Sequence, residues 1–379
     1  MNIFSTNNEN LNKDEISRYA RHISLKEIGV KGQKKLKASS VICIGTGGLG
    51  SPLLMYLAAA GVGRIGIVDF DVVEESNLQR QVIHRQSWIG KPKTSSAYES
   101  ITEINPYCKV DIYEKILNKD NALEIIKPYD LVCDCTDNFP SRYLINDTCL
   151  ILGKPNVYGS IERFEGQATV FNLDNKSPNL RDLIPEPPPS NLLPSCSEAG
   201  VLGVLPGLIG LIQATEVIKI ITGAGKTLNG RLLIFNALSM KFREINIRKN
   251  EDTLIISKLG EYPGLCLQST DQISSIKKIS VEKLKMLIQK ESNNILLIDV
   301  RESFEYNQKS INGSKLIPLK SLEEISIIKK IKNLSCERKI YVYCQTGKRS
   351  LKAIMILKSH GIEATNIHGG IDAWNKKNI

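Results

Sequence analysis

The sequence has no C-x-x-C pair, although nine cysteines are scattered along its 379 residues. An odd number of irregularly spaced cysteines argues against a disulfide framework, and the missing pairs argue against a zinc site recognisable by its ligand spacing. The polar, acidic opening stretch (MNIFSTNNENLNKDE) does not resemble a secretory signal peptide, so we expect none. We therefore expect a soluble protein of a reducing compartment, the cytoplasm or the plastid stroma.

Long apolar runs are also scarce. The longest stretch, residues 200–221, is interrupted by Gln213, Glu216 and Lys219. Because a membrane span needs about 20 predominantly apolar residues with few or no charges, this stretch predicts a buried helix, and we expect no membrane as a partner.

Aromatic residues make up only 6% of the chain, and they are not interleaved with its basic residues. The net charge of +10 lies mostly in residues 280–379, which contain 18 Lys and Arg against 10 Asp and Glu. These charges alternate with acids and with helical apolar residues. The pattern favours a solvated surface that attracts anions, and we expect no nucleic-acid partner.

The apolar pattern predicts an α/β protein of two domains. Three consecutive segments, VICIG, SPLLMYLAAAG and RIGIVDFD, are typical of strand, helix and strand, with Pro52 and Gly61 as start and stop signals of the helix. Such a βαβ unit indicates a Rossmann-like parallel sheet. We expect this first domain over residues 13–248, a linker over residues 249–279, and a smaller α/β domain over residues 280–379.

Further elements of the first domain follow from periodicity and from breaker residues. The Pro-rich segment 185–194 excludes regular structure and predicts a crossover loop. The expected elements are an amphipathic helix over residues 13–37 that ends near Gly32, a buried strand at 130–136, a helix at 200–223 and a strand at 231–237. In the smaller domain we expect strands at 294–300 and 339–344 and a helix at 350–361.

The motif Gly45-x-Gly47-x-x-Gly50 follows the first strand and opens the first helix. Backbone N–H groups at a helix N-terminus bind phosphate groups, and Asp69, at the end of the next strand, is placed to accept a ribose hydroxyl. This motif by itself serves a nicotinamide dinucleotide and ATP equally well.

The polar residues after the second strand favour ATP. Asn77, Arg80 and Gln81 are spaced so that one helical turn can aim all three at one point. Arg80 and the later Lys93 supply the cations that a triphosphate needs to neutralise its charge and hold its leaving pyrophosphate. Asp137, at the carboxyl end of a predicted parallel strand, is well placed to hold Mg²⁺.

Several segments together resemble the MoeB/ThiF adenylyltransferases of the ubiquitin-activating superfamily, over roughly residues 15–248. They are RYARHI, GTGGLGSP, DFDVVEESNLQRQ, Lys93, CTDN and CSEAGVLGVLPG. The resemblance implies that ATP, with Mg²⁺, adenylates the C-terminal glycine of a small ubiquitin-like (MoaD-like) sulfur carrier ending in Gly-Gly. The glycine carboxylate attacks the α-phosphate, and pyrophosphate leaves. It also implies a homodimer in which Arg21 reaches into the site of the partner subunit.

Carried over position by position, the resemblance gives Asp69 the ribose, Arg80 and Lys93 the phosphates, and Asp137 the metal and the reaction centre. Arg21, Arg80 and Asp137 are the expected catalytic residues of this domain. The implied nucleotide-binding set is Gly45, Gly47, Gly48, Gly50, Asp69, Ser76, Asn77, Leu78, Gln79, Arg80, Gln81, Lys93, Asp137 and Asn138.

The smaller domain resembles a rhodanese domain over roughly residues 280–379, through DVRESFEY, CQTGKRS and HGGIDAWN. Cys344 closes a strand and opens a short loop before a helix, where converging N–H groups and the helix dipole favour a thiolate or a persulfide. The resemblance implies that Cys344 receives persulfide sulfur from an upstream donor and passes it on to form a thiocarboxylate. The expected persulfide-binding loop is Gln345, Thr346, Gly347, Lys348 and Arg349.

Many MoeB/ThiF relatives bind zinc through two C-x-x-C pairs, and this chain has none. Asn179-Leu-Arg-Asp182 stands where the first pair would fall, and residues 253–256 stand near the second, so we expect no zinc. Cys196 matches a position where some relatives carry a cysteine that bonds covalently to the carrier, and a catalytic and a dispensable role stay open. Other residues are expected to be structural, namely Cys43, Cys133, Cys135, Cys149, His84 and His368.

The resemblance leaves the carrier open among molybdopterin synthesis, thiamine synthesis (a ThiS-like carrier) and tRNA thiolation. The segments NLQRQ and EAGVLG favour the molybdopterin carrier. Two functions of other classes compete with adenylation. An NAD-dependent oxidoreductase is supported only by the glycine motif, and the cluster from Asn77 to Gln81 argues against it. A non-catalytic carrier-binding scaffold would have no use for Arg80, Asp137 and Cys344.

Overall fold

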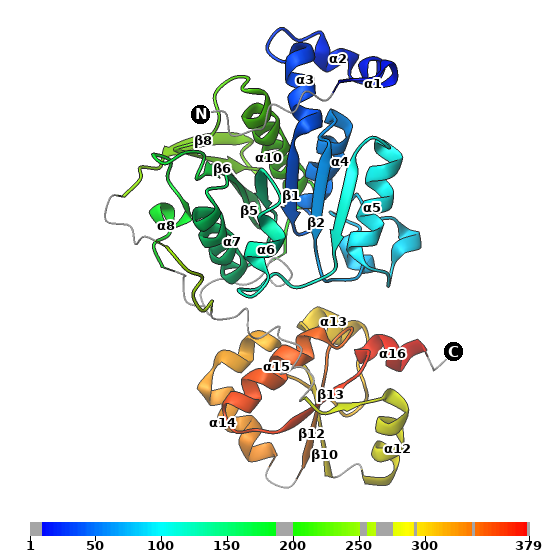
Figure 1. The fold of residues 1–379 in the computed structure, drawn as a ribbon. Coiled ribbons are helices and arrows are strands. Elements are labelled where there is room, and N and C mark those ends of the chain that lie inside the picture. Colours follow the sequence, from blue (N-terminus) through cyan, green and yellow to red (C-terminus); the bar gives the residue numbers. More distant parts are fainter. Residues whose placement is uncertain are drawn as a thin grey trace. The chain divides into compact units, whose positions relative to one another are not determined.

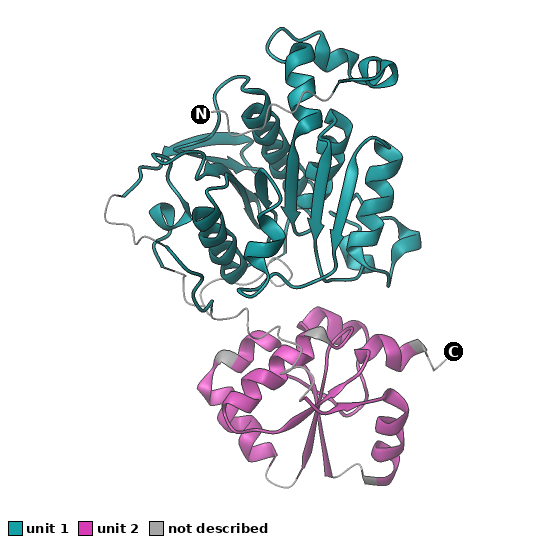
Figure 2. Cartoon of the chain, in the orientation of Figure 1, with its two compact units in different colours: residues 1–265 teal, residues 266–379 magenta. Residues whose placement is uncertain are grey.

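The structure is a computed structural model that describes residues 10–186, 200–250, 256–262, 276–291, 294–335 and 338–376. The chain divides into two compact units, residues 1–265 and residues 266–379 (Figure 2). Each unit contains its own sheet and its own buried apolar clusters.

The first unit is built on an eight-stranded sheet with the order β3-β2-β1-β4-β5-β6-β7-β8 (Figure 1). Strands β1 to β5 run parallel, and β6, β7 and β8 continue the sheet antiparallel. The strands are β1 (Ser40–Ile44), β2 (Arg64–Val68), β3 (Lys109–Tyr113), β4 (Leu131–Asp134), β5 (Asn156–Glu162), β6 (Glu165–Phe171), β7 (Arg231–Asn236) and β8 (Lys241–Asn246). The strand order reverses between β1 and β4, so a crevice for ligands is expected at their carboxyl ends.

Helices cover both faces of this sheet. On one face lie α4 (Gly50–Ala60), α5 (Lys93–Ile104) and α10 (Leu205–Thr222), and on the other lie α6 (Ala122–Ile126) and α7 (Phe139–Leu152). The remaining helices are α1 (Lys13–Arg18), α2 (Ala20–Ile23), α3 (Gly29–Ala38) and α8 (Leu180–Leu183), with single turns at η1 (Glu75–Asn77) and η2 (Gln86–Trp88). The doubly wound Rossmann-like architecture predicted from the sequence is confirmed.

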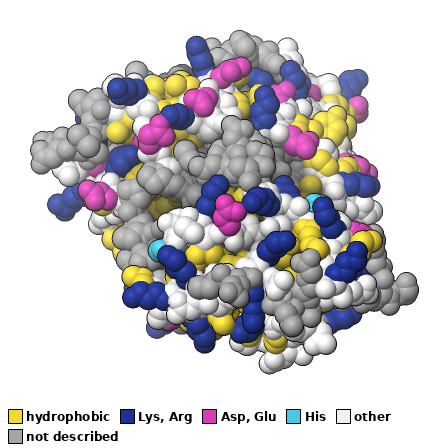
Figure 3. Space-filling view, turned by 90° about the horizontal axis from the view of Figure 1, so that it is seen from below, with side chains coloured by type: hydrophobic (Ala, Val, Ile, Leu, Met, Phe, Trp, Pro, Cys, Tyr) yellow, Lys and Arg dark blue, Asp and Glu magenta, His cyan; other side chains and the backbone are white. Residues whose placement is uncertain are grey.

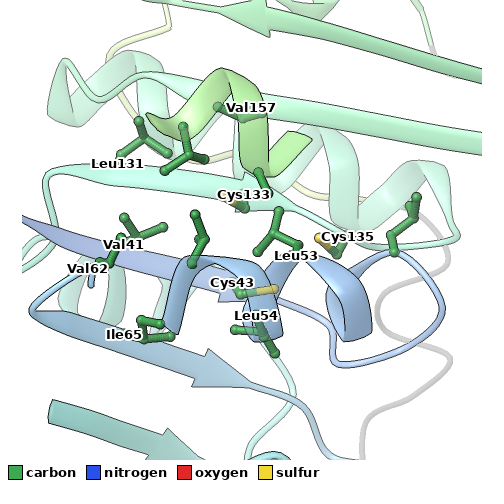
Figure 4. Packing of buried hydrophobic residues seen from close by; sticks show 14 of the residues in the cluster. Val41, Cys43, Leu53, Leu54, Val62, Ile65, Leu131, Cys133, Cys135 and Val157 are labelled. Atoms are coloured by element: carbon green, nitrogen blue, oxygen red, sulfur yellow. The ribbon is translucent and has the colours of Figure 1, made fainter. Parts of the chain in front are cut away.

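The core between the sheet and α4 is made of aliphatic and cysteine side chains. Figure 4 shows Cys43 of β1 and Cys133 of β4 among Leu53 and Leu54 of α4. Cys43, Cys133, Cys135 and Cys149 are all buried, and burial raises the pKa of the Cys149 thiol. These cysteines are core residues, as expected from their apolar patterns.

Helix α10 is long and apolar enough to cross a membrane by length and composition. It packs instead against α4, β5 and β6, and 61% of the apolar segment Leu205–Thr222 is buried within the unit. Its polar residues have partners: Gln213 Nε2 donates to the carbonyl oxygens of Asp134 and Val157 at 2.9 and 3.0 Å, and Glu216 accepts from Leu228 N at 2.7 Å. The predicted buried helix is confirmed, although it begins at Leu205 and not at residue 200.

The predicted continuous helix over residues 13–37 is wrong. The segment forms three short helices, α1, α2 and α3, because Tyr19 ends α1 with its ring buried and Gly29 has a φ of +57°. Gly32 does not end a helix either. It lies within α3, where a Cβ would meet Ile28 Cγ2 at 2.9 Å, so this glycine permits close packing.

The second unit contains a five-stranded parallel sheet with the order β11-β10-β12-β13-β9. The strands are β9 (Lys278–Ile279), β10 (Ile295–Asp299), β11 (Lys315–Leu316), β12 (Lys339–Tyr343) and β13 (Ala364–Ile367). The helices are α12 (Val281–Glu291), α13 (Ser303–Gln308), α14 (Ile325–Leu334), α15 (Lys348–Ser359) and α16 (Gly370–Lys376), with a single turn at η5 (Leu319–Glu323). The predicted smaller α/β fold is confirmed.

On one face of the protein, basic side chains lie among side chains of other kinds. Figure 3 shows Lys and Arg side chains interspersed with hydrophobic and acidic ones on the face it presents, without one continuous basic patch. This distribution agrees with a solvated surface that has net positive charge.

A polar cluster connects α7, α8 and the segment that follows β8. Arg181 of α8 donates to both carboxylate oxygens of the buried Asp147 at 2.9 and 2.7 Å, and Tyr262 Oη donates to Asp147 Oδ2 at 2.8 Å. Asn179 caps α8, and its backbone N–H donates to Asp182 Oδ2 at 2.8 Å. The cluster therefore joins three segments that are distant in the sequence.

We predict that Arg181→Ala lowers the free energy of unfolding of the first unit by about 2 to 3 kcal/mol, because Asp147 would keep a buried charge without its cation. Arg85→Ala is the control, since Arg85 and Glu103 form an exposed pair whose loss costs under about 1 kcal/mol. Scanning calorimetry of the full chain measures both variants. Equal shifts of the first unit's transition would show that the Asp147 pair contributes no more than a surface pair.

Candidate functional site

The glycine loop after β1 lies at the point where the strand order reverses. Gly45 has a φ of +98°, and a Cβ on it would lie 2.8 Å from the carbonyl oxygen of Cys135, which follows β4. A Cβ on Gly50 would lie 2.2 Å from the carbonyl oxygen of Gly45. Only glycine fits these two positions. The loop therefore opens α4 directly beside the carboxyl end of β4, which places helix N-terminal amides at the crevice.

Asp69, which follows β2, holds this loop. Thr46 donates to Asp69 Oδ2 through both its backbone N and its Oγ1, each at 2.8 Å, and Asp71 N donates to Asp69 Oδ1 at 2.9 Å. Asp69 is thus part of the loop's scaffold, and its expected contact with a ribose hydroxyl stays a prediction.

The segment after β2 forms one turn against the glycine loop. Arg80 N and Gln81 N both donate to the carbonyl oxygen of Asn77, at 3.0 and 2.9 Å. A Cβ on Gly48 would lie 3.6 Å from Arg80 Cγ, and one on Gly47 would lie 3.7 Å from Gln81 Nε2. The structure therefore brings Arg80 and Gln81 to the loop, as the spacing predicted.

The other predicted residues of this turn lie close by. Arg80 Nη1 donates to the carbonyl oxygen of Ser76 at 3.1 Å. Asn77 is buried, and its Oδ1 accepts from Glu74 N at 3.0 Å. Gln79 is exposed and Leu78 is half-buried. A Cβ on Gly203 would collide with Gln79, so this turn also contacts the chain just before α10.

Lys93 is the first residue of α5, and only 8% of its side chain is exposed. Its Nζ donates to Asp71 Oδ2 at 3.1 Å. A buried ammonium without an anion beside it is costly, so the contact with Asp71 holds the Lys93 side chain in place. Our sequence analysis did not identify Asp71 as part of the site, although the alternation Asp69-Phe70-Asp71 was a visible signal.

His84 is buried between the glycine loop and α5. Its Nε2 lies 3.1 Å from the carbonyl oxygen of Thr46, and its Nδ1 lies 3.0 Å from Ser96 Oγ. Burial and the nearby charge of Lys93 lower the pKa of His84 to about 4. Because a carbonyl oxygen only accepts, Nε2 carries the proton of the neutral ring and Nδ1 accepts from Ser96. His84, which the sequence analysis expected to be structural, therefore contacts the glycine loop directly.

Asp137 and Asn138 follow β4 and face the same crevice edge. The Asp137 side chain is exposed, and Asn138 Nδ2 lies 3.4 Å from Asp137 Oδ1. Asn138 Oδ1 accepts from Ser141 N at 3.0 Å and so caps α7. One exposed carboxylate beside a phosphate-binding loop fits Mg²⁺, which is typically held by one or two carboxylates together with substrate phosphates.

Two predicted residues are not joined to this cluster. Arg21 is exposed on α2, a helix that packs against α1 and α3. Its expected place in a partner subunit's site is untested. Cys196 lies outside the described residues.

Zinc does not fit the residues that the structure describes. Residues 179–182 stand where the first cysteine pair of zinc-binding relatives would fall. Here Asn179 and Asp182 form the capping box of α8, and Arg181 is paired with Asp147. In the described part of the chain, no group of three His, Cys, Asp or Glu side chains could hold a metal ion. Most of residues 253–256, near the second position, lie outside that part.

In the second unit, Cys344 follows the central strand β12, and its side chain is buried. Gly347 N donates to Cys344 Sγ at 3.1 Å, with Gly347 at a φ of +103°. The first turn of α16 also contacts this loop, because Ile371 N donates to the carbonyl oxygen of Cys344 at 2.9 Å. A sulfur atom here is thus held by a backbone N–H at the start of α15, as expected for a thiolate or persulfide.

Two arginines near this loop, Arg301 and Arg349, are paired with acids. Arg349 donates to Glu305 with both terminal nitrogens, at 2.7 and 2.6 Å, so its guanidinium is neutralised by Glu305 and is not a free cation at the sulfur. Although burial acts to raise it, the Arg349 contact lowers the pKa of Glu305. Gln345 accepts from Arg301 at 3.1 Å and donates to Asp372 at 2.5 Å.

The remaining loop residues divide as follows. Thr346 is exposed, and the side chain of Lys348 lies outside those the structure describes. Ser350, which the sequence analysis did not include, has its Oγ 3.6 Å from Cys344 Sγ and 2.6 Å from Asn366 Oδ1. The serine that directly follows the CQTGKR loop was a signal that could have identified it.

Comparison with known proteins identifies both domains. Residues 19–255 match the ThiF family and residues 280–377 match the rhodanese-like domain. The chain is 46% identical over 374 residues to the probable adenylyltransferase/sulfurtransferase MoeZ of Mycobacterium tuberculosis, which covers 97% of this chain and 94% of that protein. It is 40% identical over 393 residues to the adenylyltransferase and sulfurtransferase MOCS3 of Arabidopsis thaliana, covering 96% and 84%.

Solved structures give the same fold for the larger unit. The crystal structure of E. coli MccB with ATP has a TM-score of 0.55 at 20% identity, covering 67% of this chain and 76% of that one. The structure of PaaA has a TM-score of 0.53 at 26% identity, covering 66% and 78%. Family match, near full-length relatives and fold together show that the chain belongs to the ThiF family and carries a rhodanese-like domain after its ThiF domain.

Proposed function

We propose that this protein is an adenylyltransferase and sulfurtransferase that uses ATP to activate the C-terminal glycine carboxylate of a small ubiquitin-like sulfur carrier. Two observations support the proposal: the glycine loop contacts Arg80 and the end of β4, two residues before Asp137, and Asp69 links that loop to Asp71, the partner of Lys93. Two cations and a set of helix N-terminal amides suit a triphosphate better than a dinucleotide, whose two phosphates need fewer charges.

In the adenylation step, the carrier's carboxylate attacks the α-phosphorus of ATP, the bond to the β-phosphate oxygen breaks, and pyrophosphate leaves. Loop amides and Arg80 bind the phosphates, and Lys93 exchanges its contact with Asp71 for one with the developing negative charge. Asp137 would hold Mg²⁺, which neutralises phosphate charge when it is bound. Asp69 would bind the ribose beside Thr46.

In the sulfur-transfer step, the terminal sulfur of a Cys344 persulfide attacks the acyl carbon of the adenylate, and AMP leaves. A thiolate then attacks Sγ of Cys344, so that the S–S bond breaks, the thiocarboxylate is released and a disulfide forms. Cys196 or an external thiol supplies that thiolate, and a reducing thiol reopens the disulfide. The Gly347 N–H stabilises the anionic sulfur on Cys344.

The partners follow from this chemistry. The resemblance to the MoeB/ThiF adenylyltransferases implies a carrier that ends in Gly-Gly, and an upstream donor would load Cys344. The molybdopterin carrier is the favoured substrate, ahead of the thiamine-synthesis and tRNA-thiolation carriers. A homodimer that brings Arg21 to the partner subunit's site completes the proposal, in a reducing compartment that keeps Cys344 active.

We predict that Asp137→Asn and Arg80→Ala each lower carrier-dependent ATP–pyrophosphate exchange by about 100-fold or more, because each removes a charge that acts on the transferring phosphate. Arg85→Ala is the control: Arg85 lies on the same segment but is paired with Glu103 on the surface. Exchange is measured with labelled pyrophosphate for each candidate carrier. Wild-type levels in both variants would refute the proposed phosphate site, and carrier binding without exchange in the wild-type protein would favour a scaffold.

We predict that Cys344→Ala abolishes thiocarboxylate formation while pyrophosphate exchange stays within about twofold of wild type, because only the sulfur step needs the Cys344 thiol. Mass spectrometry of the carrier measures the thiocarboxylate, and Cys149→Ala controls for loss of a buried thiol that is not exposed to substrate. Thiocarboxylate formation at the wild-type rate in Cys344→Ala would show that the second unit does not supply the sulfur.

A further inference from the structure

The orientation of one peptide unit in the glycine loop depends on a residue outside the loop. Thr46, between Gly45 and Gly47, is fully buried, and all its polar groups are held: N and Oγ1 donate to Asp69, and the carbonyl oxygen lies 3.1 Å from His84 Nε2. Gly47 and Gly48, which follow, are partly exposed. The loop thus turns from a closed interior to the crevice at the Thr46–Gly47 peptide.

In a trans peptide the C=O and the next N–H point in opposite directions. Anchoring the Thr46 carbonyl on His84, in the interior, therefore directs the Gly47 N–H away from His84 and toward the exposed side of the loop. Rotation of this plane would remove that N–H from the crevice and leave a buried carbonyl oxygen without its donor, which carries its own free-energy cost.

His84 is itself held by α5. Ser96 Oγ lies 3.0 Å from Nδ1, and Ser96 is fully buried one turn after Lys93. The charge of Lys93 and burial both disfavour a second proton on the ring. The imidazole therefore stays neutral, with its N–H on Nε2, and it links the helix that begins with Lys93 to the glycine loop.

We propose that His84 is a positioning residue for nucleotide phosphate: its Nε2–H fixes the Thr46–Gly47 peptide so that the Gly47 N–H faces the phosphate chain. Ser96 sets the required tautomer. His84 contacts no substrate in this role, and it acts through Thr46. The inference rests on the proposed function, since it explains how the glycine loop of the proposed ATP site is oriented to bind phosphate.

The test compares ATP with adenosine, the nucleoside that lacks its phosphates, in four variants of the full chain. His84→Phe keeps an aromatic ring but no donor, His84→Gln keeps an N–H that can reach the Thr46 carbonyl, and Ser96→Ala removes the group that sets the tautomer. Ser100→Ala is the matched control, because Ser100 Oγ donates to the carbonyl oxygen of Ile83 at 2.8 Å and so joins the same two segments without touching the loop.

We expect His84→Phe to raise the KM for ATP in carrier-dependent exchange roughly 5- to 100-fold, the effect of a buried carbonyl losing its donor, with kcat changed less. ATP binding weakens by the same factor, whereas adenosine binding changes less than about twofold. His84→Gln restores most of the ATP affinity, Ser96→Ala gives a smaller loss of the same kind, and Ser100→Ala lowers thermal stability without changing the KM.

The inference is overturned if His84→Phe and Ser100→Ala lower stability alike and leave the KM for ATP unchanged, or if adenosine binding falls as much as ATP binding. If His84→Phe does not fold, the ratio of ATP to adenosine affinity is measured in Ser96→Ala and His84→Gln. A ratio unchanged from wild type in Ser96→Ala would then overturn the inference. A wild-type protein without exchange activity would refute the proposed function itself, whereas active wild-type protein with an indifferent His84 would refute only this inference.

Discussion

The first site depends on the close approach of two strand ends. Gly45 leaves β1 at a positive φ and lies against the carbonyl oxygen of Cys135 beyond β4, at a distance that excludes any side chain. This contact brings the amides at the start of α4 beside Asp137. Since ligands of open α/β sheets bind where the strand order reverses, the packing of these two ends creates the crevice, and every other residue of the site is placed relative to it.

In each unit, one cation of the expected site is paired with an acid. Lys93 is paired with Asp71 in the first unit, and Arg349 with Glu305 in the second. Since a buried cation without a partner would be costly, Asp71 orients the buried Lys93, and Glu305 orients the half-buried Arg349 through two hydrogen bonds. The two sites differ in the groups that we assign to ligand binding. In the first, side-chain cations and loop amides would bind phosphate. In the second, the sulfur of Cys344 is bound mainly by the backbone N–H of Gly347.

The first unit is held together by polar clusters as well as by its apolar core. Asp147, Arg181 and Tyr262 join α7 and α8 to the segment after β8 through direct hydrogen bonds. Such a cluster needs complementary groups at short range, and it depends on both partners being present. The cluster includes residues 179–182, where the first pair of zinc-binding cysteines of some relatives would fall. Its hydrogen bonds join segments that are distant in the sequence.

The sequence by itself determined the fold class, both sheets, the glycine loop and the residue types around each site, because strand and helix periodicity and the glycine spacing are local signals. It predicted a continuous helix over residues 13–37 that Tyr19 and Gly29 interrupt, since burial of a single ring is not visible in periodicity. Only the tertiary structure decided which side chains pair: His84 with Thr46, Asp71 with Lys93, and Glu305 with Arg349. These partners come from different elements, and their contacts exist only after the sheet has brought those elements together.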